Sequence, residues 1–290
     1  MFKGSMVALV TPFRDGQVDE KSLRELVEWQ ITSGTDVLTP CGTTGESATL
    51  SHEEHDRVIR IVVEQAKRRV KVLAGAGSNA TDEAVRLTKE AKKSGADGVL
   101  SITPYYNKPT QEGLYQHFKA IAASTDIPII LYNVPGRTSV NMLPETVARC
   151  AKIDNIVGIK EASGNLVQVL EILKECGSNF DVISGEDALN FPIMACGGTG
   201  SISVTANIVP HEMAAMCDSF FAGDHEKARG LHEKLLPLHE AMFFETNPIP
   251  VKTALSLMGK CSAEMRLPLC PMGETNLGRL KKVLKEHKIL

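Results

Sequence analysis

The chain has 290 residues, of which 43% are hydrophobic and 23% are charged, and its formal net charge is −3. This composition is typical of a folded globular protein and excludes a disordered or collagen-like chain. Lysine and arginine are spread along the sequence with only short clusters, such as residues 67–69, so we expect no affinity for nucleic acid.

The cysteines and the apolar runs bear on location. Seven cysteines are odd in number and lack the close spacing of zinc or redox motifs, so we expect reduced, mostly buried thiols and no metal site. The apolar run at residues 6–10 is short and leads directly into Thr11 and Pro12, which supports neither a signal peptide nor a membrane span. These features predict a cytoplasmic protein that does not bind membranes.

Short branched or apolar runs alternate with amphipathic segments along the first two thirds of the chain. We predict eight strands, at residues 7–10, 37–39, 72–74, 98–102, 129–132, 156–160, 182–184 and 201–204. One apolar helical face lies between the first two strands, at Leu23, Leu26, Val27 and Ile31. Ser51 and Glu54 have the spacing of a capping box at the start of another helix. Helices are expected to end near Gly34, Gly95 and Gly177.

Strand and helix alternating eight times, with nearly continuous apolar strands, favour a parallel sheet closed into a (β/α)8 TIM barrel. An open doubly wound sheet is the alternative, but no GxGxxG motif follows the first strand. After Val204 the pattern is helical, with a break at residues 247–250, where two prolines remove backbone donors. We predict a barrel over residues 1–224 and a C-terminal helical domain over residues 225–290.

Lys160 is a single cation at the end of the apolar run 156–160, which has the pattern of a buried strand. Desolvation disfavours a charged ammonium, and a neutral amine can attack a carbonyl to form a Schiff base. The alternative is a lysine that reaches solvent at the strand end or pairs with a buried acid. Alternation along the strand places Glu161 on the opposite face, which weakens the simplest ion-pair explanation.

Other polar residues follow neighbouring strands, whose carboxyl ends form the active sites of such barrels. The turn at residues 42–45, Gly-Thr-Thr-Gly, could bind a small carboxylate or phosphate through its N–H groups and hydroxyls, or be an ordinary turn. Tyr132 could transfer protons or donate to an oxyanion, or only fill the core. Arg137 could bind a second carboxylate, or lie exposed without a specific role.

Four motifs together carry a resemblance to a known family. They are GTTGE at residues 42–46, TPYYN at 103–107, YNVPGRT at 132–138 and GIKEA at 158–162. With them the chain resembles the dihydrodipicolinate synthase family of pyruvate-dependent aldolases, and the match extends from Gly4 to Lys252. The resemblance implies a barrel enzyme of lysine and diaminopimelate biosynthesis. It would condense pyruvate with L-aspartate 4-semialdehyde as a Schiff-base-forming lyase, without a metal or organic cofactor.

The resemblance also implies roles for single residues. Lys160 would form the imine, and the protons would be relayed by Thr43, Tyr132 and Tyr106. Pyruvate would be held by Thr44, Gly185 and Ile202, and Arg137 would bind the carboxylate of the semialdehyde. In the family the tyrosine that matches Tyr106 reaches the neighbouring subunit's site, which implies a tight homodimer, usually paired into a tetramer.

An effector site is implied as well. In family members that lysine inhibits, the inhibitor binds between subunits, and the matching positions here are Ser47, Ala48, His52, His55, Asn79, Glu83 and Tyr105. We therefore expect feedback inhibition by L-lysine. Taken without the resemblance, His52 and His55 are one helical turn apart and could be a metal pair, but no third ligand lies near and exposed helix histidines are the ordinary expectation.

Three other functions are compatible with parts of the pattern. A sister aldolase that cleaves N-acetylneuraminate would share Lys160 and Tyr132 but would typically lack an arginine at the position of Arg137. A non-catalytic barrel could bind pyruvate or lysine as a sensor. A phosphate-binding barrel could use the glycine-rich loop at residues 197–200 before the eighth strand.

Overall fold

The computed structural model describes residues 1–290 and is built around a closed barrel of parallel strands. Its eight strands are β1 (Gly4–Ala8), β4 (Val37–Thr39), β5 (Lys71–Gly75), β6 (Gly98–Ile102), β7 (Ile129–Asn133), β8 (Ile156–Glu161), β9 (Asp181–Ser184) and β10 (Gly200–Ser203). Around the barrel the order is β1-β10-β9-β8-β7-β6-β5-β4, and β4 pairs with β1 to close the ring. The predicted TIM barrel is confirmed.

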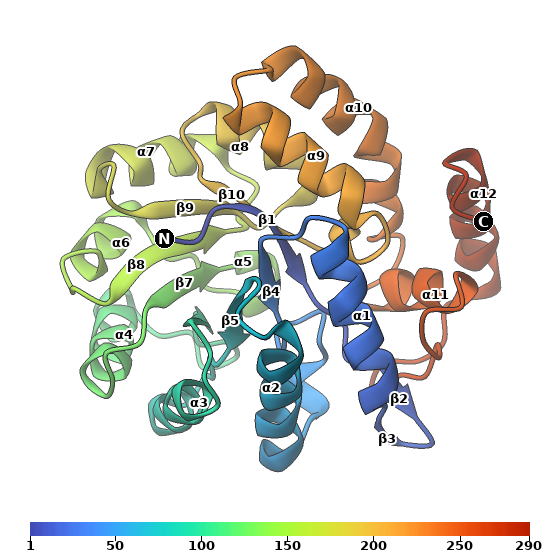
Figure 1. Cartoon of the computed structure of the whole chain (residues 1–290). Coiled ribbons are helices and arrows are strands. Elements are labelled where there is room, and N and C mark those ends of the chain that lie inside the picture. The colour runs from blue at the N-terminus through green and yellow to red at the C-terminus, as the bar shows by residue number, and fades with distance from the viewer.

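Helices surround this barrel, as Figure 1 shows. The outer ring consists of α1 (Glu20–Thr32), α2 (His52–Ala66), α3 (Thr81–Lys93), α4 (Gln111–Ala123), α6 (Pro144–Cys150), α7 (Leu166–Cys176), α8 (Asn190–Ala195) and α9 (Pro210–Phe221). Four short helical turns lie in the loops: η1 (Ser47–Thr49), α5 (Pro135–Thr138), η2 (Asp187–Leu189) and η3 (Thr205–Asn207). None of the helices combines the length and the apolar character needed to cross a membrane.

The predicted helix signals act as expected. The Ser51 hydroxyl accepts from the N–H of Glu54, and the Glu54 carboxylate accepts from the N–H of Ser51, which closes the capping box of α2. Gly177 caps α7 with a φ of 72°, a conformation that glycine adopts without a steric penalty. Leu23 and Leu26 on α1 are buried against the barrel.

Two details of the first segment differ from the prediction. Strand β1 begins at Gly4 and ends at Ala8, so Leu9 and Val10 follow the strand instead of ending it. A small hairpin, β2 (Phe13–Arg14) and β3 (Gln17–Val18), was not predicted. Its turn is Asp-Gly with φ of 53° and 77°, the type of turn that suits the twist of a two-residue hairpin.

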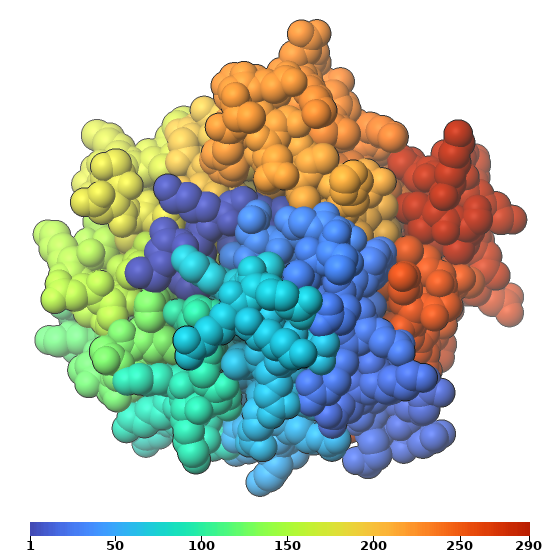
Figure 2. All heavy atoms as spheres, in the orientation of Figure 1, coloured from blue at the N-terminus to red at the C-terminus, as the bar shows by residue number.

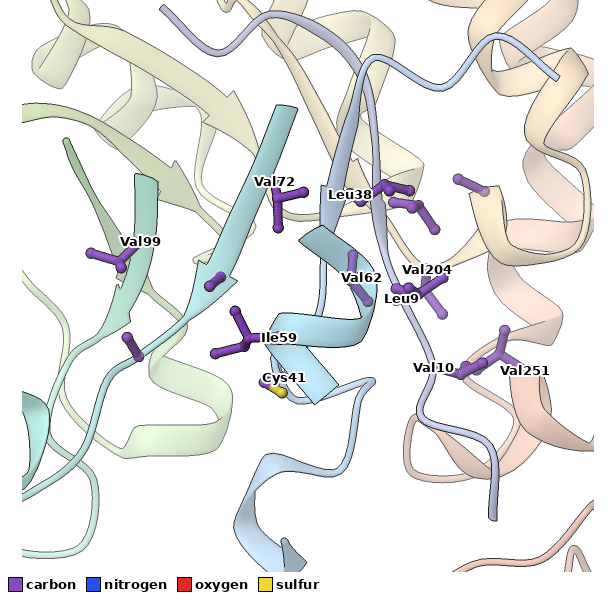
Figure 3. Close-up of a cluster of buried hydrophobic side chains, with 14 of the residues drawn as sticks. Leu9, Val10, Leu38, Cys41, Ile59, Val62, Val72, Val99, Val204 and Val251 are labelled. Atoms are coloured by element: carbon purple, nitrogen blue, oxygen red, sulfur yellow. The ribbon is translucent and has the colours of Figure 1, made fainter. Parts of the chain in front are cut away.

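Two hydrophobic clusters fill the molecule. The larger one, of 59 buried residues, lies between the strands and the outer helices, and Figure 3 shows part of it with Ile59 and Val62 facing Val72. The smaller one, of 11 residues, lies inside the barrel and includes Phe2 and Tyr132. Phe2 is fully buried, and the blue N-terminal residues lie in the middle of the face shown in Figure 2. One end of the barrel is thus filled by side chains.

The chain ends in three helices, α10 (His225–Ala241), α11 (Ile249–Leu257) and α12 (Glu274–Glu286). The predicted break at residues 247–250 is correct only in part. Residues 242–248 separate α10 from α11, which begins at Ile249, and Pro250 lies in the first turn of α11, where no N–H is needed. Val251 and Leu280 belong to the same large cluster as the barrel helices. In Figure 3, Val251 of α11 lies beside Val10.

All seven cysteines are free thiols. Only Cys41, Cys150 and Cys217 are buried, so the expectation of mostly buried thiols is wrong for the other four, which lie in loops or at helix ends nearer the surface. Burial raises the pKa of Cys150 and of Cys217 to about 12, which makes these two thiols unreactive.

Candidate active site

Lys160 and Tyr132 are paired across adjacent strands inside the barrel. The register of β7 and β8 places Tyr132 opposite Lys160, and both residues are buried, with 7% and 6% of their surface exposed. The Lys160 Nζ lies 4.4 Å from the centroid of the Tyr132 ring. Lys160 forms no ion pair with any carboxylate, unlike the other buried lysine, Lys252. A buried amine that forms no ion pair and lies next to a phenol is suited to carbonyl chemistry.

Glu161 lies on the opposite face of β8, as the alternation predicted. Its carboxylate accepts hydrogen bonds from the amides of Asn133 at 3.0 Å and Gln168 at 3.2 Å, and from the N–H of Ser163 at 2.7 Å. Because these donors satisfy the carboxylate, it is not available to Lys160. The register places Asn133 opposite Glu161, directly behind the pair formed by Tyr132 and Lys160.

Gly185 and Ile202 complete the surroundings of Lys160. A Cβ atom on Gly185 would lie 2.9 Å from the Lys160 Cε and 2.8 Å from the Ala162 Cβ, so only glycine leaves room for the lysine side chain. Ile202 on β10 is buried in the barrel cluster together with Tyr132. Glu186 follows Gly185, and burial raises the pKa of its carboxyl, with Asp187 adding to the shift and Lys160 opposing it.

The turn at residues 42–45 lies beside this pair. Thr43 lines a cavity at this end of the barrel. Thr44 is buried, and its hydroxyl accepts a hydrogen bond from the Asn247 amide at 3.0 Å. Gly45 lies so close to Leu9 and Cys41 that a Cβ would be 2.9 Å from the N of Cys41. The glycine therefore lets the turn fold tightly over the end of the barrel.

Arg137 lies on α5 and is exposed, at the edge of this cavity. Its side chain lines the same cavity and donates to the backbone oxygen of Asn247 at 3.3 Å. This one neutral contact leaves most guanidinium donors free for a carboxylate.

One cavity of about 450 Å³ brings the two predicted sets of residues together. Its lining includes catalytic and substrate-binding candidates, Thr43, Tyr132 and Arg137, and effector candidates, Ser47, Ala48, His52, His55, Glu83 and Tyr105. Lys160, Thr44, Gly185 and Ile202 are not part of this lining; Gly185 is half-buried and the other three are buried. A larger hollow, of about 810 Å³, lies at the opposite end of the barrel around Lys71 and Asp97, away from these residues.

Two predicted residues lie outside the cavity. Tyr106 is 89% exposed and has a φ of 72°, so within one chain it is not brought to Lys160. Asn79 does not line the cavity, but its backbone oxygen accepts from the Asn107 side chain at 2.9 Å, next to Tyr106.

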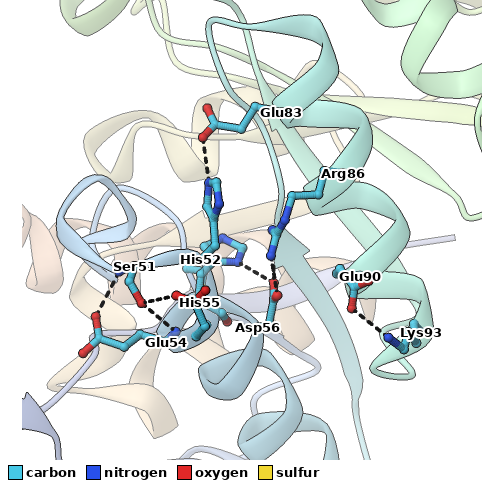
Figure 4. Close-up of polar contacts among 11 residues, drawn as sticks. Ser51, His52, Glu54, His55, Asp56, Glu83, Arg86, Glu90 and Lys93 are labelled. Atoms are coloured by element: carbon cyan, nitrogen blue, oxygen red, sulfur yellow. Dashed lines mark hydrogen bonds and ion pairs between the residues drawn. The ribbon is translucent and has the colours of Figure 1, made fainter.

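Two of the effector candidates, His52 on α2 and Glu83 on α3, join these helices, as Figure 4 shows. His52 binds Glu83 at 2.8 Å, and the Ser78 hydroxyl donates to the other oxygen of Glu83. These two contacts, with Ser78 the stronger influence, lower the pKa of Glu83 and keep its carboxylate charged. Burial raises the pKa of the neighbouring Tyr105, and the negative charge of Glu83 adds to the shift.

The expectation of exposed helix histidines is correct for His52 and wrong for His55. The His52 side chain is 49% exposed, whereas that of His55 is 6% exposed. His55 lies on the inner face of α2, and its Nδ1 is 3.7 Å from Asp56 (Figure 4). Burial lowers the pKa of His55, while Asp56 opposes that shift. His55 is therefore neutral at physiological pH.

The C-terminal segment, for which no site role was predicted, forms one wall of the cavity. Thr246, Asn247, Pro248, Pro268 and Leu269 all line it. The only feature of the sequence that points to this wall is the break at residues 247–250, where two prolines close to an asparagine indicate a loop. Nothing in that pattern indicates that the loop faces a turn 200 positions earlier.

The chain matches the model of the dihydrodipicolinate synthetase family over residues 1–287. A 4-hydroxy-tetrahydrodipicolinate synthase of Geotalea uraniireducens is 63% identical over 290 residues, which cover all of both chains.

Solved structures agree with this similarity. The chloride-inhibited dihydrodipicolinate synthase of Acinetobacter baumannii, in complex with pyruvate, is 48% identical with a TM-score of 0.98 over all of both chains. The corresponding protein of Cyanidioschyzon merolae, with lysine bound, is 40% identical with a TM-score of 0.97, and the match covers 100% of this chain and 99% of that one.

Proposed function

We propose a role for each residue of this site from the premise that the chain belongs to the dihydrodipicolinate synthetase family. It is an enzyme with 4-hydroxy-tetrahydrodipicolinate synthase activity, a Schiff-base-forming lyase of lysine and diaminopimelate biosynthesis. The proposal concerns which side chains perform the reaction. The observation that carries it is the buried Lys160 amine, without a carboxylate partner, beside the ring of Tyr132.

Lys160 is the proposed nucleophile. Its Nζ attacks the C2 carbonyl of pyruvate, water leaves, and an imine joins C2 to the lysine. Loss of a C3 proton gives an enamine, whose C3 attacks the aldehyde carbon of L-aspartate 4-semialdehyde. The amine of that substrate then attacks the imine carbon, closes the ring and releases Lys160. Each step needs protons moved at a fixed place, which Tyr132 and Thr43 supply in this proposal.

Two anion sites position the substrates in the proposal. The turn that carries Thr43 and Thr44 binds the pyruvate carboxylate with its N–H groups and hydroxyls. Gly185 and Ile202 shape the space beside C2 and C3. Arg137, whose guanidinium has one neutral contact, binds the carboxylate of the semialdehyde.

Reductive trapping tests the assignment of Lys160. Borohydride added with pyruvate should attach one reduced pyruvate to Lys160, located by mass spectrometry of peptides, and Lys160→Ala should carry no adduct. An adduct on another lysine, or none at all with active enzyme, contradicts the proposal.

We also propose a homo-oligomer, a tetramer built from two tight dimers, in which Tyr106 completes the proton relay of the neighbouring subunit. Its 89% exposure on one chain supports this, because a large aromatic side chain in water is expected at an interface. Sedimentation together with activity of Tyr106→Phe tests it. A fully active monomer would contradict the role of Tyr106.

We propose that L-lysine inhibits the enzyme by binding at Ser47, Ala48, His52, His55, Asn79, Glu83 and Tyr105. The lysine-bound relative supports this, as does the charged carboxylate of Glu83, which suits an ammonium. A steady-state rate unchanged up to millimolar lysine would remove the proposal. A cytoplasmic location and the division into residues 1–224 and 225–290 also stay predictions.

A further inference from the structure

Glu46 and Lys252 come from distant parts of the chain and form an ion pair in which both side chains are 0% exposed. The Lys252 ammonium donates to one oxygen of Glu46 and lies 4.1 Å from the centroid of the Phe13 ring. A buried pair of this kind adds little net stability, because the lost hydration of both charges offsets their attraction. The position of the pair indicates what else it does.

Glu46 directly follows the turn that carries Thr43 and Thr44. Its backbone is left-handed, with φ of 54° and ψ of 36°, a conformation that is unfavourable for a residue with a Cβ and must be held by its contacts. The N–H of Glu46 donates to the backbone oxygen of Thr43 at 3.1 Å. A displacement of Glu46 is therefore passed directly to the turn.

The C-terminal segment holds Glu46 from two sides. Lys252 on α11 binds one carboxylate oxygen, and the N–H of Arg266 donates to the other at 3.3 Å. The Arg266 guanidinium is itself fixed by both oxygens of Glu54, at 2.6 and 2.5 Å, and by the backbone oxygen of Thr49 at 3.0 Å. Both ends of the segment 46–54 are thus hydrogen-bonded to the C-terminal segment.

We propose that Lys252 and Arg266 are positioning residues that, through Glu46, hold the turn in the geometry that binds the keto acid carboxylate. This inference rests on the role proposed above for Thr43 and Thr44. Neither Lys252 nor Arg266 lines the cavity, so their influence passes through Glu46, which does. Loss of these contacts weakens pyruvate binding and also slows proton transfer, because the same turn carries Thr43, whereas the reacting amine on β8, a separate strand, stays in place.

The test separates positioning from folding with three variants of the full-length enzyme. Lys252→Met leaves the Glu46 carboxylate buried without a cation, so it lowers the melting temperature as well as pyruvate binding. Glu46→Gln with Lys252→Met removes both charges and recovers most of the melting temperature. Thr253→Val, also on α11, is the control, since the Thr253 hydroxyl only binds the backbone oxygen of Ile249.

The double variant is expected to keep a KM for pyruvate raised about tenfold and a kcat lowered severalfold, because the displaced turn both binds the carboxylate and carries Thr43. A double variant with recovered stability and an unchanged KM overturns the inference. If the double variant does not fold, Arg266→Gln decides. It keeps the backbone N–H that bonds Glu46 and removes the guanidinium contacts to Glu54 and Thr49 that fix the position of that N–H. It should raise the KM severalfold, and an unchanged KM overturns the inference equally.

The two proposals fail in different ways. Absence of a borohydride adduct on Lys160 in the unmodified enzyme contradicts the proposed nucleophile and leaves the KM comparison intact. An adduct that forms at the same half-saturating pyruvate concentration in the original enzyme and in the double variant contradicts the positioning role alone.

Discussion

Gly185→Ala provides the sharpest test of the geometry around Lys160. The new methyl carbon would lie 2.9 Å from the Lys160 Cε and 2.8 Å from the Ala162 Cβ. Ordinary carbon contacts are about 3.5 Å, so the Lys160 side chain has to move by about 0.6 Å. The strand-end backbone that carries Ala162 yields less easily than the lysine, so most of the displacement falls on the amine proposed as the nucleophile.

The expected loss of activity follows from that displacement. A misplacement of about 1 Å at a reacting group can reduce the rate about 100-fold, so we expect kcat/KM to fall between about 10-fold and 100-fold. This corresponds to about 1.4 to 2.7 kcal/mol of transition-state stabilisation. Overpacking should also lower the free energy of unfolding by about 1–3 kcal/mol.

The assay measures kcat/KM, the rate of borohydride trapping and the urea midpoint in parallel. Gly136→Ala is the matched control, because a Cβ there meets no atom within 4 Å although the residue adjoins Arg137. Trapping and turnover at the original rates in Gly185→Ala would refute the reasoning, since they would mean that Lys160 does not react from the position it occupies here.

Three further predictions concern stability and inhibition. Glu161→Gln places an amide where three donors, from Asn133, Ser163 and Gln168, already point. It should lower the free energy of unfolding by about 1–3 kcal/mol, measured by urea denaturation. An unchanged urea midpoint would contradict the role of these hydrogen bonds. Burial lowers the pKa of His117 to about 4, so the folded protein holds this ring in its neutral form. The stability that this provides is complete above about pH 6.5. As the pH falls toward 4, about 3 kcal/mol of it is lost. The melting temperature of His117→Gln should therefore fall less over that pH range than that of the unmodified enzyme, and equal losses would exclude His117 as the cause. Glu83→Gln should weaken the proposed inhibition by L-lysine at least about tenfold and leave kcat unchanged, because a charge-assisted hydrogen bond to the lysine ammonium is lost. An unchanged half-inhibitory lysine concentration would mean that lysine binds elsewhere.

Much of the barrel could be predicted because strand and helix signals are local. Strand β4 has the predicted bounds, and Ser51 caps α2 as its spacing with Glu54 indicated. The predicted range of the first strand, residues 7–10, was three positions too late at its start. Gly4 and Ser5 lack the apolar side chains that indicate a buried strand, although both are buried in the barrel wall. The Asp-Gly pair at residues 15–16 is the local signal from which the first hairpin could have been predicted.

The site was harder to predict wherever it depends on long-range contacts. Alternation along β8 correctly separated Glu161 from Lys160, because side-chain direction in a strand follows from residue parity. The link from Asn247 to Thr44 spans 203 positions, and the link from Lys252 to Glu46 spans 206. No local pattern encodes such pairs. The burial of His55 depends likewise on which face of α2 the barrel covers.

The filled end of the barrel has a consequence for the traffic of reactants. Phe2 is packed so closely under β6 that a Cβ on Gly98 would lie 2.5 Å from its ring. Keto acid and semialdehyde therefore reach Lys160 from the opposite end, past the cavity lined by Arg137, and product and the water released by imine formation leave on the same side.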